Sequence, residues 1–178
     1  MFRSAHSALT WAYETINRPI VKMSGANRMR EQNTRRAPPE AIVGLSVHEQ
    51  HAQAAAIIGM AERLADPVSR EYIAARFGGM TKPEHVTMMM MDRIFTALGT
   101  GIHGRRGAYK LLLCYFGANI GYGAIRFDLK CRDAVVIEIR RKVYDTLDLI
   151  GRRAMGEMAA NLEQHGLVES IILRAASS

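Results

Sequence analysis

Apolar residues recur at every third or fourth position through much of this chain, which is the spacing of an amphipathic helix. Residues 4–16 follow this spacing, and the Arg18-Pro19 pair is expected to end the helix. Residues 46–64 also follow it, and Ser46-Val47-His48-Glu49 opens them as a capping box, in which a hydroxyl and a carboxylate satisfy free backbone N–H groups. Both stretches are predicted to be helices.

Two further helices are predicted in the middle of the chain. Asp66-Pro67 suits an N-cap followed by a first helical turn, and the apolar spacing after it stops at Gly78-Gly79. Thr81-Lys82-Pro83-Glu84 repeats the capping-box pattern and is expected to open a helix that reaches Gly99. Together with the helix over 46–64, these segments predict a helical bundle.

The C-terminal part predicts two short helices, at about 108–118 and 122–129, and a long helix that begins near Arg132. A glycine-rich, basic break over 99–107 precedes them. The long helix carries one apolar stripe, which consists of Val135, Val136, Ile139, Val143, Leu147 and Ile150. No segment shows a convincing strand pattern.

The segment IGYGAIRFDLKCRDAVVIEIRRKV fits the pattern of a helix-turn-helix, in which apolar residues lock two helices around a tight turn. The predicted lock consists of Ile125, Leu129, Cys131, Val136 and Ile139. Two positions depart from the usual pattern: Arg126 stands where close helix approach favours Ala, and Lys130 stands at the turn position that favours Gly. The predicted fold is therefore all-α, a helical bundle with a C-terminal helix-turn-helix and a long terminal helix.

This register predicts which side chains face DNA. They are Arg126, Lys130, Arg132, Asp133, Ile137, Glu138, Arg141 and Lys142. Arginine can bind guanine edges with two hydrogen bonds, and the acids can accept from cytosine. Lys130 and Lys142 are expected to pair with phosphate. The alternative interpretation is an ordinary helical hairpin whose charged residues face solvent.

The charge distribution favours a polyanionic partner. The chain has 24 Lys and Arg against 17 acids, a net charge of +7, and the positive charge lies in two blocks. Residues 1–36 hold seven basic residues against two acids, and residues 103–153 hold eleven against five. The predicted contacts to phosphate or RNA are Arg28, Arg30, Arg35, Arg36, Arg105 and Arg106. The basic arm that carries the first four can equally be a plain linker.

The apolar spacing and the charge distribution divide the chain into three parts, and the absence of catalytic motifs argues against an enzyme. Residues 1–40 are interpreted as an N-terminal helix with a basic arm, 41–100 as the helical bundle, and 101–178 as the DNA-binding region with its long helix. No Walker loop, zinc spacing or nucleophile in a recognisable turn is found, and GTGIHG at 99–104 lacks the preceding strand of a dinucleotide site. We therefore expect no enzyme, no metal and no cofactor.

No run of about 18 apolar residues and no signal-peptide core is present in the sequence. The expectation is a protein of the bacterial host cytoplasm with no membrane contact. Cys114 and Cys131, the only two cysteines, are expected to be reduced core residues there.

Several stretches together resemble the phage late-gene antitermination proteins called Q, in their compact type with a sigma-like DNA-binding region. These stretches are ALTWAYET, HAQAAAIIGMAERL and LLLCYFGANIGYGAIRFDLKCRDAVVIEIRRKVYDTLDLIG. The resemblance implies a protein that binds DNA near a late promoter and joins paused RNA polymerase. It also implies transcription through pauses and terminators, with nascent RNA and further copies of the protein as additional partners.

Two other functions remain open at this stage. A simple helix-turn-helix repressor or activator would bind DNA without travelling with polymerase. A basic helical assembly module would form oligomers and have negligible affinity for DNA.

Overall fold

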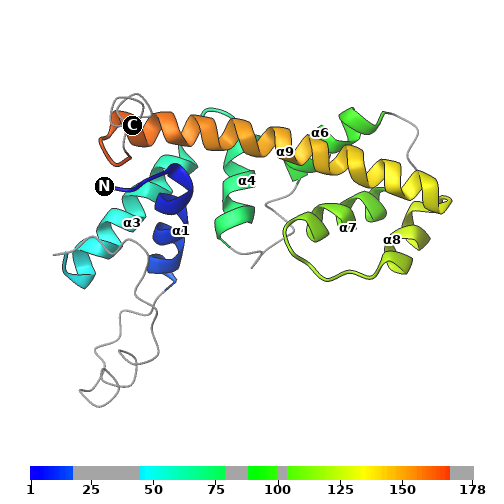
Figure 1. The fold of residues 1–178 in the computed structure, drawn as a ribbon, viewed down its shortest axis with the longest axis horizontal. Coiled ribbons are helices and arrows are strands. Elements are labelled where there is room, and N and C mark those ends of the chain that lie inside the picture. The colour runs from blue at the N-terminus through cyan, green and yellow to red at the C-terminus, as the bar shows by residue number, and fades with distance from the viewer. Residues whose placement is uncertain (18–44, 79–87, 100–103, 169–178) are drawn as a thin grey trace, which may run out of the picture. The chain divides into compact units, whose positions relative to one another are not determined.

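The computed structural model describes residues 1–17, 45–78, 88–99 and 104–168, and within these residues the protein is all-α. Helices account for 79% of the described residues, and none of these residues belongs to a β-strand. Figure 1 shows the helices of the described segments, which are α1 (Ala5–Ile16), α3 (Val47–Glu62), α4 (Pro67–Phe77), α6 (Met88–Leu98), α7 (Arg105–Tyr115), α8 (Tyr122–Leu129) and α9 (Asp133–Gln164).

The described residues fall into two compact units. Unit 1 takes its described residues from Met1–Arg63 and Glu157–Ser178, and unit 2 takes them from Leu64–Gly156. Helix α9 contributes residues to both. The boundary at Leu64 lies within 41–100, so α3 and α4, which the sequence suggested for one bundle, belong to different units.

In unit 1, α1 packs against α3, and the chain beyond α9 joins the N-terminal segment. The backbone N–H of Phe2 donates to the carbonyl of Leu167 at 2.8 Å, and Phe2 forms an isolated parallel bridge with Val168. The buried ring of Phe2 lies 5.2 Å from the ring of Trp11, measured between centroids. These contacts place the buried rings of Phe2 and Trp11 in one small core.

The helix starts of unit 1 follow from their own side chains. At α3 the Glu49 backbone N–H donates to the Ser46 hydroxyl at 3.3 Å, and the Ser46 backbone N–H donates to the Glu49 carboxylate at 2.7 Å. The Ser46 hydroxyl also donates to the Glu49 carboxylate at 2.7 Å, and this hydrogen bond, followed by the one from the Ser46 N–H, lowers the pKa of Glu49 below its ordinary value. Helix α1 begins with a similar reciprocal pair between Ser4 and Ser7. The capping box predicted at Ser46 is therefore confirmed.

Unit 2 contains α4, α6, α7, α8 and the greater part of α9. Asp66 caps α4 by accepting from the Val68 N–H at 3.0 Å, as its sequence predicted. The start of α6 is capped from another helix, because the Glu71 carboxylate accepts from the backbone N–H groups of Met89 and Met90. Desolvation raises the pKa of Glu71, and these two hydrogen bonds act in the opposite direction.

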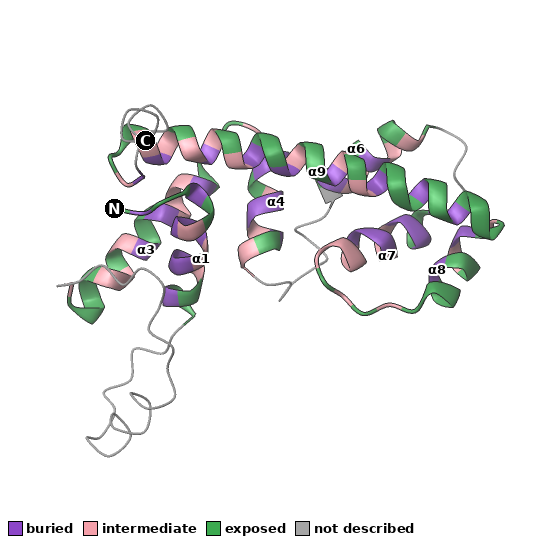
Figure 2. Ribbon diagram, viewed as in Figure 1, coloured by how far each residue is buried: buried purple, intermediate pink, exposed green. Residues whose placement is uncertain are grey.

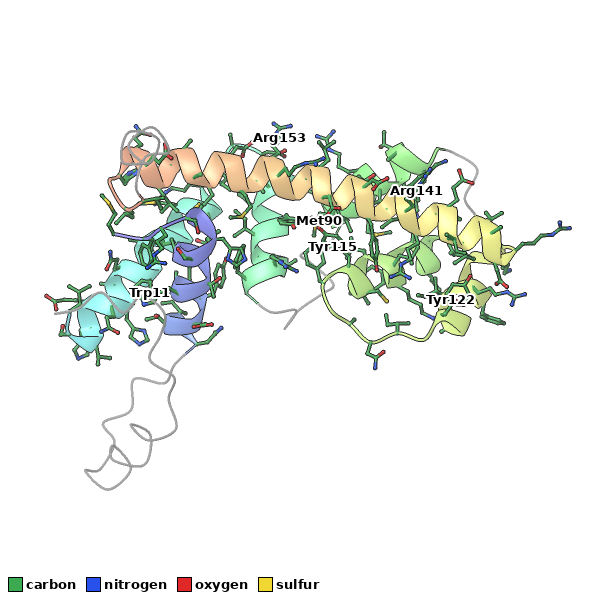
Figure 3. All side chains as sticks on the ribbon, in the orientation of Figure 1. Trp11, Met90, Tyr115, Tyr122, Arg141 and Arg153 are labelled. Carbon is green, nitrogen blue, oxygen red and sulfur yellow. The ribbon has the colours of Figure 1, made fainter. Side chains whose placement is uncertain are left out.

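An aromatic cluster joins α4, α7 and α9 within unit 2. Tyr115, labelled in Figure 3, donates its hydroxyl proton to Asp148 at 2.6 Å, and its oxygen lies 3.3 Å from the Tyr72 hydroxyl. Desolvation, followed by these hydrogen bonds, raises the pKa of Tyr115 far above its ordinary value. A Cβ atom at Gly151 would lie 2.5 Å from the Tyr72 hydroxyl, so glycine permits this close contact between α4 and α9.

Three sequence expectations need correction. The break predicted over 99–107 is shorter, since α7 begins at Arg105 rather than near residue 108. Val135 is 42% exposed and does not belong to the buried stripe of α9; the predicted members Val136, Ile139, Val143 and Leu147 are buried, and Ile150 is half-buried. Figure 2 shows buried positions in purple along α9 between exposed positions in green. The two cysteines are free thiols but only half-buried, so neither is a full core residue.

The capping box expected at 81–84 lies outside the described residues. Within the methionine run that follows it, Met90 is buried and Met89 is 45% exposed.

Candidate nucleic-acid interface

The candidate interface is positioned by a close contact between α7 and α8. A Cβ atom at Gly107 would lie 2.6 Å from Leu129 Cδ2 and 3.1 Å from its backbone nitrogen, and one at Gly104 would lie 2.8 Å from Cδ2. The ammonium of Lys110 binds the Asp128 carboxylate at 2.7 Å, adding an ion pair between the same helices. Helix α8 is therefore seated on α7 by two glycines, one leucine and one ion pair.

The turn between α8 and α9 consists of three residues, 130–132. Lys130 has a φ of 51° and a ψ of 35°, and it is the one non-glycine residue with a positive φ in the described segments. Its N–H donates to the Arg126 carbonyl at 3.0 Å, which closes the last turn of α8. The position at which the sequence pattern favours glycine thus adopts the left-handed conformation that glycine adopts most readily.

Apolar side chains join α8 to α9 on the inner side of this turn. Ile125, Leu129, Val136 and Ile139 are 5%, 2%, 0% and 6% exposed, respectively. These four positions were predicted to be buried, and they are. Cys131, the fifth predicted member, is half-buried, and its thiol donates to the Leu129 carbonyl at 3.0 Å.

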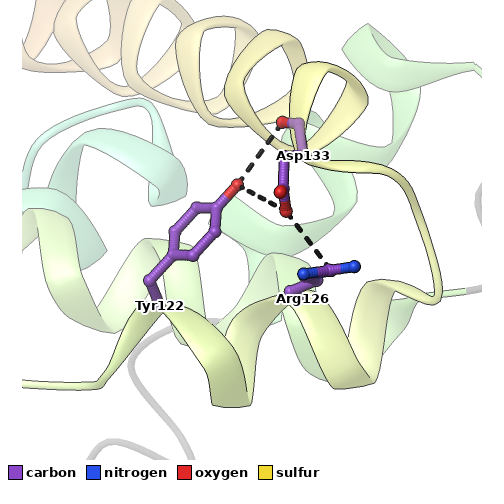
Figure 4. Close-up of polar contacts among 3 residues, drawn as sticks. All are labelled: Tyr122, Arg126 and Asp133. Atoms are coloured by element: carbon purple, nitrogen blue, oxygen red, sulfur yellow. Dashed lines mark hydrogen bonds and ion pairs between the residues drawn. The ribbon is translucent and has the colours of Figure 1, made fainter.

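A polar contact joins the outer side of α8 to the start of α9, as Figure 4 shows. Arg126 Nε lies 3.2 Å from Asp133 Oδ1, and the Tyr122 hydroxyl donates to the same oxygen and to the Asp133 carbonyl, both at 3.4 Å. Local desolvation and the negative charge of Asp133 raise the pKa of Tyr122. Arg126, the first departure from the helix-turn-helix pattern, thus lies at the rim of the helix contact rather than inside it.

The outward face of α9 is basic after its pairs are taken into account. Glu138 binds Lys142 at 3.0 Å, and the hydrogen bond from Lys142 lowers the pKa of Glu138. Within the described parts of the chain, no ion pair or hydrogen bond holds the side chains of Lys130, Arg132 or Arg141. All three are exposed, and Arg141 is labelled in Figure 3.

Of the six residues predicted to contact phosphate or RNA, the structure describes only Arg105 and Arg106. Arg105 and Arg106 are exposed in the first turn of α7, where the Arg105 guanidinium lies 5.2 Å from the centroid of the Phe95 ring. The four arm residues lie outside the described residues, and they are Arg28, Arg30, Arg35 and Arg36.

The sequence analysis did not identify the residues that pack α8 against α7, nor the exposed aromatic residue on α8. Gly104 and Gly107, at the N-cap and in the first turn of α7, are the signal of close helix approach, but the sequence analysis interpreted them as part of a glycine-rich break. The Lys110–Asp128 ion pair spans 18 positions and has no local signal. Phe127, on the outer side of α8, is 79% exposed, and its sequence does not distinguish it from a core aromatic residue.

The comparisons add no family. No protein-family model matches this sequence, and no curated protein is significantly similar to it. Among the described residues, no group of three His, Cys, Asp or Glu side chains could hold a metal ion. None of the helices in those segments has the length and apolar character that a membrane span requires.

Proposed function

We propose that this protein is a transcription regulator that binds duplex DNA through α8, the turn at 130–132 and the first turns of α9. The observation that carries the proposal is the left-handed Lys130 between two helices locked by four buried apolar residues. A turn of this kind is what a helix-turn-helix uses to leave one face of its second helix free for the major groove.

The charges on that face support a polyanionic partner. Asp133 is engaged by Arg126, and Glu138 is engaged by Lys142, so both carboxylates of the outward face are neutralised within the protein. Lys130, Arg132 and Arg141 form no ion pair within the described segments, although the charge of Arg141 also lowers the pKa of Glu138. We assign Lys130 to phosphate, and Arg132 and Arg141 to guanine edges. Lys142, which the sequence pattern assigned to phosphate, is engaged by Glu138 in the structure.

The more specific proposal is that the regulator is a phage late-gene antiterminator. It rests on the sequence resemblance to the compact Q proteins, and its partners would be bacterial RNA polymerase and nascent RNA as well as DNA. Copies of the protein would assemble on DNA as the resemblance implies.

The first test is selection of binding sites from a random duplex library, followed by affinity measurements across a salt series. We expect Arg132→Ala or Arg141→Ala to weaken binding to the selected site by about 1–3 kcal/mol relative to random duplex. Arg152→Ala is the matched control, because Arg152 is an exposed arginine further along α9. Equal, weak binding to all duplexes by wild type and variants would contradict the DNA-binding proposal.

A second assay separates an antiterminator from a simple repressor or activator. Purified protein is added to RNA polymerase paused downstream of a promoter that carries the selected site, and readthrough of a terminator is measured. Increased readthrough with retention of the protein on the elongating complex supports antitermination. DNA binding without either effect supports the simpler regulator, and oligomers without DNA affinity support the assembly module.

A further inference from the structure

Exposed apolar side chains gather at the α8–α9 corner. Nine large hydrophobic side chains are substantially exposed in the described residues, and four of them lie between positions 122 and 137: Tyr122, Phe127, Val135 and Ile137. Single exposed apolar residues are common on protein surfaces and need no explanation, but a concentration of them marks a binding surface. The corner therefore has an apolar component that its basic charge alone does not account for.

Ile137 holds a particular place in this surface. It is 63% exposed, and it lies one helical turn after Asp133 and one turn before Arg141, so the three share a face of α9. Val135, two positions earlier, lies on the opposite flank of the helix. Ile137 is thus the exposed aliphatic residue within the same stripe as the arginine that we assign to DNA.

The surrounding charge identifies the chemistry of the partner. The basic residues Lys130, Arg132 and Arg141 lie near Ile137 in the sequence. Their positive charge favours a polyanionic partner over a protein surface with few acidic residues. In the major groove of duplex DNA, the apolar group that a side chain can contact is the C5-methyl group of thymine. Arg132 and Arg141, which precede and follow Ile137 along the chain, would bind guanine edges while the sec-butyl side chain of Ile137 meets this methyl group.

We infer that Ile137 determines specificity for a thymine within the DNA site by packing against its C5-methyl group. The inference rests on the proposed function, because it takes duplex DNA as the ligand. It adds a base preference that the charged residues cannot supply, since Lys130 reaches phosphate and arginine favours guanine.

The test replaces each thymine of the selected duplex, one at a time, with deoxyuridine. Uracil pairs with adenine as thymine does but lacks the methyl group, so only contacts to that group are lost. We expect one position at which wild-type affinity falls about fourfold, the effect of losing one buried methyl-sized group. The Ile137→Ala variant should bind the thymine and uracil duplexes equally.

Leu149→Ala is the matched control, because Leu149 is an aliphatic residue of α9 outside this corner and is 61% exposed, and this variant should retain the full difference between thymine and uracil. Both variants change exposed residues of a long helix, so circular dichroism should show unchanged helix content. If selection yields no duplex site, the proposed function fails and the inference fails with it. If a site is selected but wild type ignores the methyl groups, or Ile137→Ala still distinguishes them, only the inference is overturned.

Discussion

Helices α3 and α8 differ in how their ends are determined. At α3, Ser46 and Glu49 cap the helix reciprocally, and every contact involved lies within four residues of sequence. At α8 no side chain caps the first turn at Gly121, and the helix ends at Lys130 in a left-handed conformation that costs about 1–2 kcal/mol for a non-glycine residue. Helix α3 is specified locally, whereas α8 depends on its neighbours.

The difference extends to the surfaces of the two regions. Helix α3 buries Ala54, Ile57 and Ala61, and of its large apolar residues only Val47, in its first turn, is substantially exposed. The α8–α9 corner exposes Phe127 and Ile137 beside unpaired basic residues. Positions at which local rules fail within an otherwise consistent sequence are where functional sites are expected. The comparison therefore supports the corner as the binding surface and α3 as a structural helix.

The largest effect should come from the contact that seats α8. Gly107→Ala would place a methyl group against the side chain and backbone of Leu129, so α7 and α8 would have to separate. We expect a loss of about 2–3 kcal/mol in the free energy of unfolding, measured by urea titration, because overpacked sites cost this much.

Gly123→Ala is the control for Gly107→Ala. Gly123 also lies in this helix pair, but nothing approaches its Cβ position within 4 Å, so alanine should stabilise α8 slightly. Equal stability of the two variants would show that α8 does not depend on the α7 contact.

A smaller effect is expected at the locally specified helix. Ser46→Ala removes the hydroxyl that accepts from the Glu49 N–H, and loss of such a cap costs about 1 kcal/mol. Val47→Ala, at an exposed first-turn position with no capping role, should change stability much less. Chemical denaturation of both variants at neutral pH gives the comparison.

The pH dependence of the same variant provides a second measurement. The pKa of Glu49 is depressed in the folded protein, chiefly by its hydrogen bond with Ser46. Its contribution to stability is therefore present above the ordinary glutamate pKa and is lost as the pH falls through the lower, folded value. Ser46→Ala should weaken this acid-side loss. An unchanged pH profile would argue against the reciprocal cap.

Lys130→Gly should raise stability by about 0.5–1 kcal/mol, because glycine adopts the positive φ without strain while losing some chain entropy on folding. Lys130→Ala removes the same charge but keeps the strained conformation, so it should not stabilise. Thermal unfolding of the pair separates conformation from charge. The affinity for DNA should fall equally in the two variants, since both lose the proposed phosphate contact.

The sequence predicted those elements whose determinants are local. Capping side chains located the starts of α3 and α4, and apolar spacing with the turn at Lys130 located α8 to the residue. The start of α7 was misplaced, because Arg105 and Arg106 follow a glycine-rich stretch and become helical through tertiary contacts of Gly104 and Gly107.

The candidate interface shows the same limit. Its apolar lock was predictable from spacing, and four of its five members are buried. The pairing of Arg126 with Asp133, which neutralises a residue expected to read bases, could not be predicted, because it depends on the angle between α8 and α9. Likewise, Tyr115 and Asp148 are 33 positions apart and carry no shared local pattern.

The smallest predicted effect distinguishes packing from charge as the force that holds the corner. Arg126 and Asp133 are 56% and 59% exposed, so solvent screens their attraction. A double-mutant cycle of Arg126→Ala and Asp133→Ala should give a coupling energy of only about 0.5 kcal/mol, well below the effect of Gly107→Ala. A coupling energy of several kcal/mol would mean that the ion pair, rather than the buried apolar residues that join α8 to α9, determines the angle between these two helices.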